Sequence, residues 1–317
     1  MIERALVTGG AGFIGSHIAD AYLEHGWAVT VLDDLSSGRR ENVPAAADFV
    51  ECGVNDPAGR KLLESGDFTI LNHHAAQMDV RVSVSDPLLD ERVNIAGLLN
   101  LLEGARGSGV RRVVFASSGG VVYGESGALP HPENARKLPV SPYGVSKLAS
   151  EYYLAMYAQL HGLEVVSLRY ANVYGPRQNP HGEAGVVAIF CDKILKGESL
   201  TIYGDGSQTR DYVYVGDVVR ANVAAAQREV GPFTSIDDVA FNVGTGIETN
   251  VNDLARTLLD AAGVAADVPI EHAPERAGEL ARSAVDPAKM ATRWDWTPLV
   301  DLTEGLQRTY DWIAAHQ

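Results

Sequence analysis

Tyr143 and Lys147 are the two residues of this chain whose types and spacing most directly indicate chemistry. They lie four residues apart in the run 141–147 (SPYGVSK), so their side chains share one face if the run is helical. Ser141 is a suitable N-cap and Pro142 a suitable first helical residue, which places the tyrosine in the first turn. The helix dipole and the lysine ammonium would both favour the phenolate and lower its pKa from about 10. Such a tyrosine can act as a base near neutral pH.

A Tyr-x-x-x-Lys spacing is common by chance, and alone it would describe a pair of surface residues. A second feature supports the chemical interpretation, because the apolar run 113–116 ends in Ser117 and Ser118, followed by two glycines. In doubly wound sheets the strand ends border the ligand crevice. A serine hydroxyl there can bond a substrate hydroxyl or the phenol, and the alternative is an ordinary turn or N-cap serine.

A glycine-rich turn predicts a dinucleotide site. Residues 9–15 (GGAGFIG) follow a short apolar run, open a helical pattern and contain Gly9, Gly12 and Gly15 at intervals of three. Such a turn lets backbone N–H groups approach a pyrophosphate closely. Asp33 ends the second strand-like run, where a carboxylate binds both adenosine ribose hydroxyls and repels a 2′-phosphate, favouring NAD over NADP. The alternative is a glycine turn with a solvated aspartate.

Apolar strands alternate with helical patterns in the first half of the chain, which predicts a parallel sheet covered on both faces. The fold expected is a doubly wound α/β (Rossmann) fold with a smaller C-terminal α/β substrate-binding region. Residues 1–170 are expected to form the NAD-binding domain, completed by elements from about 211–245, and 171–317 to be mainly substrate-binding. The expected strands are Ala5–Thr8, Ala28–Leu32, Thr69–His73, Val113–Ser117 and Val165–Arg169, and the expected helices are Ile14–His25, Val93–Arg106 and Tyr143–His161.

The composition excludes several classes of function. The 317 residues carry 26 Lys+Arg against 41 Asp+Glu, a net charge of −15, which argues against nucleic acid or an anionic membrane surface as partner. No apolar run is long enough to span a bilayer and no secretory signal is seen, so a cytoplasmic protein is expected. Cys52 and Cys191 stand alone in no motif. His73 and His74 would point to opposite faces of a strand, so no metal site is expected.

Taken together, these motifs resemble the extended short-chain dehydrogenase/reductase family, and within it the nucleotide-sugar 4-epimerases of the UDP-glucose 4-epimerase type. The resemblance runs almost end to end. Besides the glycine turn and the Tyr143–Lys147 pair, it rests on the segments 33–38 (DDLSSG), 73–77 (HHAAQ), 93–95 (VNI), 169–177 (RYANVYGPR), 208–212 (QTRDY), 276–279 (RAGE) and 296–298 (WTP).

The resemblance implies reversible NAD-dependent oxidation at C4 of a UDP-hexose, UDP-Glc/UDP-Gal and also UDP-GlcNAc/UDP-GalNAc. It assigns Tyr143 as catalytic base and acid, Ser118 as its hydroxyl partner and Lys147 as the residue that holds the nicotinamide ribose. The implied NAD contacts are Gly9, Gly12, Phe13, Ile14, Gly15, Asp33, Asp34, Val54, Ala75, Asn94, Lys147 and Tyr170. The implied substrate contacts are Ser118, Tyr143, Asn172, Val186, Arg210 and Arg276.

Three departures from the family pattern affect this assignment. Gly53-Val54 replaces the usual Asp-Ile, so the carboxylate that contacts adenine is missing although a backbone contact could survive. Gly119-Gly120 lengthens the loop after the strand, so Ser117 remains a rival to Ser118. The segment that often carries an asparagine beside the diphosphate reads EAGV at 183–186.

The loop at 119–122 (GGVV) lacks the Asp-Glu pair of related 4,6-dehydratases and the glutamate of related decarboxylases, which favours epimerisation. The resemblance implies that the position seven residues after Arg276, here Ser283, limits the size of the C2 substituent, and the small serine predicts acceptance of N-acetylated sugars. UDP-glucuronate epimerisation, a nucleotide-sugar 4-ketoreductase and a non-catalytic binding protein remain alternatives. Family members commonly form dimers, which predicts a homodimer through the helices 93–106 and 143–161.

Overall fold

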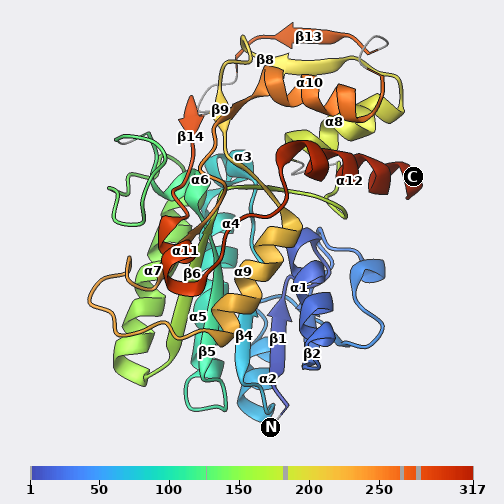
Figure 1. The fold of residues 1–317 in the computed structure, drawn as a ribbon. Coiled ribbons are helices and arrows are strands. Elements are labelled where there is room, and N and C mark those ends of the chain that lie inside the picture. Colours follow the sequence, from blue (N-terminus) through green and yellow to red (C-terminus); the bar gives the residue numbers. More distant parts are fainter. Residues whose placement is uncertain (1, 126, 181–184, 265–267, 276–279, 317) are drawn as a thin grey trace. The chain divides into compact units, whose positions relative to one another are not determined.

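The computed structural model of the chain describes residues 2–125, 127–180, 185–264, 268–275 and 280–316. The chain forms two compact units (Figure 1). Unit 1 contains residues 1–122, 139–169 and 219–241, and unit 2 contains 123–138, 170–218 and 242–317. The expected assignment of cofactor and substrate binding to separate domains stays a prediction.

A seven-stranded sheet forms the centre of unit 1, with the strand order β11-β6-β5-β4-β1-β2-β3. The pairs β1–β2, β1–β4, β2–β3 and β4–β5 are parallel. The order reverses direction between β1 and β4, and ligands of doubly wound folds bind outside the carboxyl ends of strands at such a switch point. The strands are β1 (Arg4–Thr8), β2 (Ala28–Asp33), β3 (Asp48–Glu51), β4 (Ile70–His73), β5 (Arg112–Ser118), β6 (Glu164–Tyr170) and β11 (Ala240–Val243).

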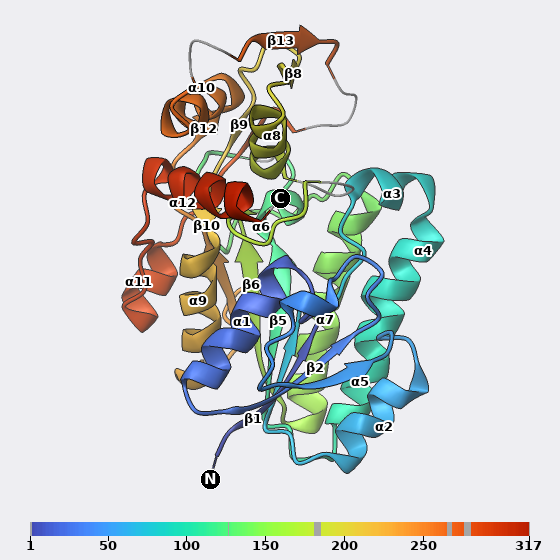
Figure 2. The ribbon, with the colours of Figure 1, turned by 90° about the vertical axis from the view of Figure 1, so that its right-hand side faces the viewer.

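Helices cover both faces of this sheet, as Figure 2 shows: α1 and α9 lie on one face, and α2, α5 and α7 on the other. On the α1 side, Asn72 of β4 donates to the hydroxyl of Tyr22 and to Oδ1 of Asn222. The helices are α1 (Phe13–Glu24), η1 (Arg40–Asn42), α2 (Pro57–Ser65), α3 (Val80–Ser85), α4 (Pro87–Glu91), the π-helix η2 (Arg92–Ala96), α5 (Gly97–Ala105), α6 (Gly119–Val122), α7 (Pro142–His161) and α9 (Val215–Gln227).

Unit 2 combines short strands with helices, three of which pack around its own apolar core. The core includes Phe190, Leu254, Leu258 and Leu306, contributed by α8, α10 and α12. The strands are β7 (Asn172–Tyr174), β8 (Leu200–Tyr203), β9 (Thr209–Arg210), β10 (Tyr212–Tyr214), β12 (Thr249–Asn250), β13 (Ile270–Ala273) and β14 (Arg282–Ser283), and the helices are α8 (Val186–Leu195), α10 (Val251–Ala261), α11 (Ala288–Trp294) and α12 (Leu302–Ala315).

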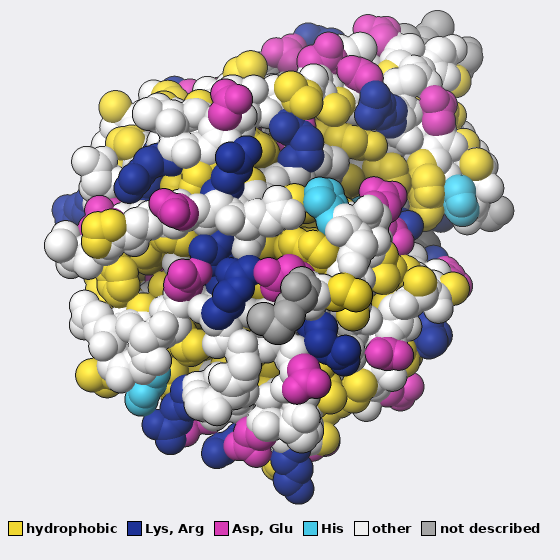
Figure 3. Space-filling model, turned by 60° about the horizontal axis from the view of Figure 1, so that its bottom comes forward, with side chains coloured by type: hydrophobic (Ala, Val, Ile, Leu, Met, Phe, Trp, Pro, Cys, Tyr) yellow, Lys and Arg dark blue, Asp and Glu magenta, His cyan; other side chains and the backbone are white. Residues whose placement is uncertain are grey.

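The fold class predicted from the sequence is confirmed, and all five expected strands are present. The helix expected over 93–106 instead begins as the π-helix η2 and continues as α5. Within the described residues, no helix is long and apolar enough to cross a membrane. The face drawn in Figure 3 intersperses acidic and basic side chains, so the net charge of −15 is not gathered in one block on that face.

Candidate active site

Helix α7 begins as the sequence predicts and carries the Tyr143–Lys147 pair in its first two turns. Ser141 is the N-cap, its hydroxyl accepts from the N–H of Gly144 at 3.2 Å, and Pro142 is the first helical residue. Both side chains therefore extend from one face of the helix start, where the dipole favours negative charge. Tyr143 is half-buried.

The ammonium of Lys147 is enclosed by unit 1, with only 3% of the residue exposed. It donates to the carbonyl oxygen of Ala116 at 2.8 Å. It also lies 4.8 Å from the centroid of the Phe115 ring and 5.7 Å from that of Tyr143. Burial lowers the pKa of Lys147 to about 8, against the opposing effect of the carboxylates of Asp90 and Glu151. A positive charge is thus fixed beside the tyrosine, where it favours the phenolate.

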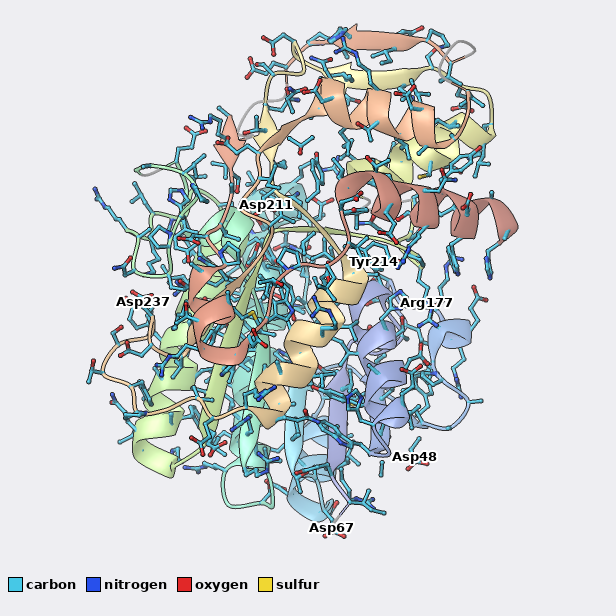
Figure 4. The ribbon with its side chains drawn as sticks, viewed as in Figure 1. Asp48, Asp67, Arg177, Asp211, Tyr214 and Asp237 are labelled. Carbon is cyan, nitrogen blue, oxygen red and sulfur yellow. The ribbon has the colours of Figure 1, made fainter. Side chains whose placement is uncertain are left out.

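The two serines at the end of β5 have different surroundings. Ser117 is 3% exposed and its hydroxyl donates to Oε1 of Glu151 at 2.5 Å. Arg169 pairs with the same carboxylate at 2.6 Å, and with Asp237 on the loop between α9 and β11 at 3.0 Å (Figure 4). Ser118 is half-buried at the last position of the strand. Neighbouring residues of a strand point to opposite sides of the sheet. Ser118 is therefore not part of the buried cluster formed by Ser117, Glu151 and Arg169.

The glycine turn after β1 is shaped as a phosphate-binding turn requires. Gly9 has a φ of 69°, and a Cβ there would lie 2.6 Å from the backbone nitrogen of Ala75. A Cβ on Gly15 would collide with the carbonyl oxygen of Gly9. Gly12 is the N-cap of α1 and no side chain caps this helix. The N–H groups at the start of α1, including those of Phe13 and Ile14, thus remain available for an anionic group, so this cradle fits NAD.

Asp33 lies at the end of β2, as predicted, with 7% of the residue exposed. Its two carboxylate oxygens accept from the N–H groups of Ala11 and Leu35, each at 2.9 Å. Burial raises the pKa of Asp33 while these hydrogen bonds oppose the shift. The neighbouring Asp34 is exposed and accepts from the N–H and hydroxyl of Ser36 at 3.0 and 2.6 Å.

Asn94 lies in the π-helix η2 and its side chain is bonded to the protein. Its amide group donates to the carbonyl oxygen of Gln77 and to Asp90, at 2.8 and 2.9 Å, and its Oδ1 accepts from the N–H of Gln77 at 2.9 Å. Asn94 therefore fixes the loop after β4, which contains Ala75. Val54 is buried, and its carbonyl oxygen accepts from Asn100 at 2.8 Å.

His73 is a buried neighbour of the site whose role the sequence did not indicate. Thr8 accepts from the N–H groups of His74 and Ala75, each at 3.2 Å, so its own hydroxyl proton is free to bond Nδ1 of His73 at 2.7 Å. The imidazole stacks on Phe115 with ring centroids 5.9 Å apart. Burial and the charge of Lys147 lower the pKa of His73 to about 3, so the ring is neutral. No group of three or more potential metal ligands occurs among the residues that the structure describes.

Unit 2 places two predicted substrate residues on adjoining short strands. Arg210 on β9 pairs in parallel register with Ser283 on β14, so their side chains lie on the same side of this small sheet. Arg210 is half-buried and donates to the carbonyl oxygen of Thr209 at 2.8 Å, and Ser283 is 7% exposed. Asp211, labelled in Figure 4, accepts from the N–H and hydroxyl of Thr245 at 2.9 and 2.7 Å. It thereby anchors the end of β9.

The remaining predicted residues of unit 2 are distributed over three elements. Tyr170 is buried at the end of β6, Asn172 is exposed at the start of β7, and Val186 is half-buried at the start of α8. Arg276 lies outside the described residues. So do Glu183 and Ala184, which belong to the segment 183–186 that differs from the family pattern.

Comparisons with known proteins agree with this architecture. The family model described as "NAD dependent epimerase/dehydratase family" matches residues 5–244. The chain is 46% identical over 315 residues to a UDP-glucose 4-epimerase of Mycolicibacterium smegmatis, covering 98% of both chains. A UDP-glucose 4-epimerase of Thermotoga maritima, solved with UDP-glucose, matches with a TM-score of 0.93 and 43% identity over 99% of both chains. A UDP-glucose 4-epimerase of Thermus thermophilus, solved with NAD, matches with a TM-score of 0.89 and 45% identity over 98% of both chains. The predicted family is confirmed: this chain belongs to the NAD-dependent epimerase/dehydratase family.

Proposed function

We propose that this protein is a UDP-hexose 4-epimerase that retains NAD and interconverts UDP-glucose and UDP-galactose. The observation that carries the proposal is the buried ammonium of Lys147, held against Ala116 and 5.7 Å from the ring of Tyr143 at the start of α7. A protein that only binds nucleotides has no need of a half-buried tyrosine beside a fixed positive charge at the end of a strand. Relatives that are 43–46% identical over nearly their full length are named UDP-glucose 4-epimerases.

Tyr143 performs the proton transfer in this proposal. Its phenolate, favoured by Lys147, removes the proton of the C4 hydroxyl, while Ser118 holds that hydroxyl by a hydrogen bond. When bound, NAD supplies the reversible acceptor of the C4 hydride. After the 4-keto sugar has presented its other face, Tyr143 returns the proton to the C4 oxygen. The hydride and proton removed are both restored, so no external oxidant or reductant is consumed.

The cofactor residues proposed for unit 1 are those at the switch point of the sheet. The N–H groups after Gly9 and Gly12 bind the pyrophosphate, and Asp33 accepts hydrogen bonds from the adenosine ribose and disfavours a 2′-phosphate. The further contacts proposed are Phe13, Ile14, Gly15, Asp34, Val54, Ala75, Asn94 and Lys147 in unit 1 and Tyr170 in unit 2.

The substrate contacts proposed for unit 2 are Asn172, Val186, Arg210 and Arg276. A guanidinium group offers several N–H donors to phosphate oxygens, which suits Arg210 and Arg276 to the diphosphate of a nucleotide sugar. The register of Arg210 with Ser283 supports a second activity on UDP-GlcNAc and UDP-GalNAc, because the residue beside the diphosphate-binding arginine is small.

We also propose that the protein is a homodimer. Four large apolar residues of α7 are exposed, and their spacing places them on one stripe of the helix: Val145 at 51%, Tyr152 at 60%, Tyr153 at 37% and Leu160 at 68%. Exposed apolar side chains gathered on one helix face mark protein interaction surfaces. Light scattering after gel filtration tests this, with a mass of twice 33.9 kDa expected and a monomer contradicting the proposal.

One assay separates the candidate functions. Purified protein is incubated with UDP-glucose, UDP-GlcNAc or UDP-glucuronate without added cofactor, and C4 epimers are followed by NMR. Formation of UDP-galactose supports the proposal, and conversion of UDP-glucuronate alone assigns the other epimerase activity. Conversion that consumes added NAD(P)H in stoichiometric amount indicates a ketoreductase, and no conversion with nucleotide bound indicates a binding protein.

A further inference from the structure

Asp90 is a fully buried carboxylate of unit 1 that the proposed mechanism does not use. It lies on α4 with 0% of the residue exposed. Its Oδ1 accepts from the side-chain amides of Asn94 and Gln77 at 2.9 and 3.2 Å, and its Oδ2 accepts from the hydroxyl of Ser146 at 2.5 Å. All three donors are neutral. A buried carboxylate with neutral partners is costly unless a positive charge lies nearby.

These hydrogen bonds join elements that are distant in the sequence. Asp90 connects α4 to the loop after β4 through Gln77, to η2 through Asn94, and to α7 through Ser146. Ser146 immediately precedes Lys147 on α7. The carboxylate is therefore tied to the turn of α7 that presents the lysine.

The charges around Lys147 indicate what the Asp90 carboxylate does. Asp90 and Glu151 are the two groups that act to keep Lys147 protonated against burial. Glu151, however, is already paired with Arg169, which donates to both of its oxygens at 3.0 and 2.6 Å. The imidazoles of His73 and His74 contribute no charge, because burial and the lysine lower the pKa of each to about 3. Asp90 is the carboxylate near Lys147 that these described contacts leave unneutralised.

We infer that Asp90 is a positioning residue for the reaction: it holds the second turn of α7 through Ser146 and supplies the counter-charge that keeps Lys147 an ammonium ion beside Tyr143. This inference rests on the proposed function for the roles of Lys147 and Tyr143. The residue itself touches neither the sugar nor the cofactor in this assignment and acts through the lysine.

The direct test is a titration of Lys147 by NMR. The chain has six lysines, so protein labelled with ¹³C at the lysine ε-carbons gives few signals, and Lys147→Arg identifies the one from Lys147. Asp90→Asn removes the charge at nearly the same size, and Ser146 can accept from the new amide. We expect the midpoint of Lys147 to fall by about one pH unit or more, because removing a nearby negative charge disfavours the ammonium form. An unchanged midpoint would overturn the inference.

The matched control is Ser146→Ala, which removes the hydrogen bond to α7 and leaves the carboxylate. In Ser146→Ala the titration midpoint of Lys147 is expected to move by only a small fraction of the shift expected for Asp90→Asn. A fall as large as that of Asp90→Asn would assign the effect to packing instead of charge. Asp90→Ser is the smaller charge-free variant to use if Asp90→Asn does not fold, with the same fall expected. Asp90→Glu, which restores the charge, is expected to return the midpoint toward that of the unchanged protein.

The pH dependence of turnover gives a second readout. In Asp90→Asn the alkaline limb of kcat is expected at lower pH, whereas a purely structural role would lower kcat at every pH without moving the limb. Failure of the inference and failure of the proposed function differ in outcome. If the unchanged protein forms no C4 epimer, the function is wrong, yet the Lys147 titration still decides whether Asp90 sets its charge.

Discussion

The hydroxyl of Ser117 donates a 2.5 Å hydrogen bond to Oε1 of Glu151, which joins the end of β5 to the helix that carries Tyr143 and Lys147. Glu151 follows Lys147 by four residues and Tyr143 by eight, so the three lie along one stripe of α7. Arg169 of β6 holds the same carboxylate at 2.6 Å. The stripe is thus fixed at its buried end, and this assigns different roles to the two serines.

Exchanging each serine for alanine is expected to separate stability from catalysis. Ser117→Ala removes a donor to a buried carboxylate and should lower the free energy of unfolding by about 1–3 kcal/mol, with little change in kcat. Ser118→Ala should lower kcat by about 10²-fold or more, because it removes a hydrogen bond to the reacting oxygen, with stability nearly unchanged. Urea unfolding and the NMR assay measure the two effects. A larger loss of kcat in Ser117→Ala would reverse the assignment.

Tyr143→Phe is expected to lower kcat by about 10²–10⁴-fold, because it removes the hydroxyl proposed to move the C4 proton. NAD should remain bound, since the exchange leaves the glycine turn and Asp33 untouched, and nucleotide released on denaturation measures this. Tyr152→Phe on the same helix is the control, because Tyr152 is 60% exposed and should retain full turnover. Near-normal turnover of Tyr143→Phe would remove the tyrosine from the mechanism.

The local part of this site could be predicted from the sequence because its signals are local. Ser141, Pro142, Tyr143 and Lys147 fall within seven residues, and the N-cap, the first turn and the shared face follow from helix geometry alone. The glycine turn and Asp33 likewise belong to one continuous unit, in which β1, the turn and α1 are followed by β2. The apolar strand runs locate the sheet, since buried parallel strands are continuously apolar.

The rest of the site depends on contacts between distant segments, which spacing does not encode. Asp90 bonds Ser146 across 56 positions, and Arg169 reaches Asp237 across 68. The strand β3 was not predicted because its residues are half-buried or exposed and two of its four are acidic. The π-helical start of the helix at 93–106 has no signal in residue type either, because it is associated with the hydrogen bonds of Asn94 to Gln77.

The buried Lys147 predicts opposite effects of alkaline pH on activity and on stability. The pKa of Lys147 in the folded protein, about 8, lies below the ordinary lysine value of 10.5, so between these values the unfolded chain binds more protons than the folded one. Below pH 8 the folded protein therefore carries the full free-energy cost of burying the ammonium ion. This cost decreases as the pH rises toward 10.5, so the free energy of unfolding increases over that range. Activity should fall over the same range, because the neutral amine no longer favours the phenolate.

Urea unfolding of the unchanged protein and of Lys147→Met at a series of pH values measures the stability effect. As the pH rises from 8 to 10.5, the free energy of unfolding of the unchanged protein should increase relative to that of Lys147→Met. A difference between the two that stays constant with pH would show that burial does not shift the lysine. The kcat profile should show its alkaline limb near pH 8.

Asp33→Asn is expected to weaken the discrimination between NAD and NADP. The amide keeps the size of the side chain and can still accept from Ala11 or Leu35, but it no longer repels a 2′-phosphate. A ratio of the two dissociation constants that moves toward NADP by about tenfold corresponds to about 1.4 kcal/mol. Calorimetric titration of protein freed of nucleotide measures both constants. Asp56→Asn, at the N-cap of α2, is the control and should leave the ratio unchanged.

Ser283→Tyr is expected to exclude N-acetylated sugars while leaving UDP-glucose turnover. Ser283 is 7% exposed and pairs in register with Arg210, so a large ring at this position would occupy space beside the arginine proposed to hold the diphosphate. The ratio of kcat/KM for UDP-GlcNAc to that for UDP-glucose should therefore fall, by about tenfold or more if the ring costs the larger sugar about 1.4 kcal/mol. Ser283→Ala keeps the volume small and should keep the ratio. An unchanged ratio in Ser283→Tyr would mean that the C2 substituent is accommodated elsewhere, because the added ring would then lie outside the space that the N-acetyl group fills.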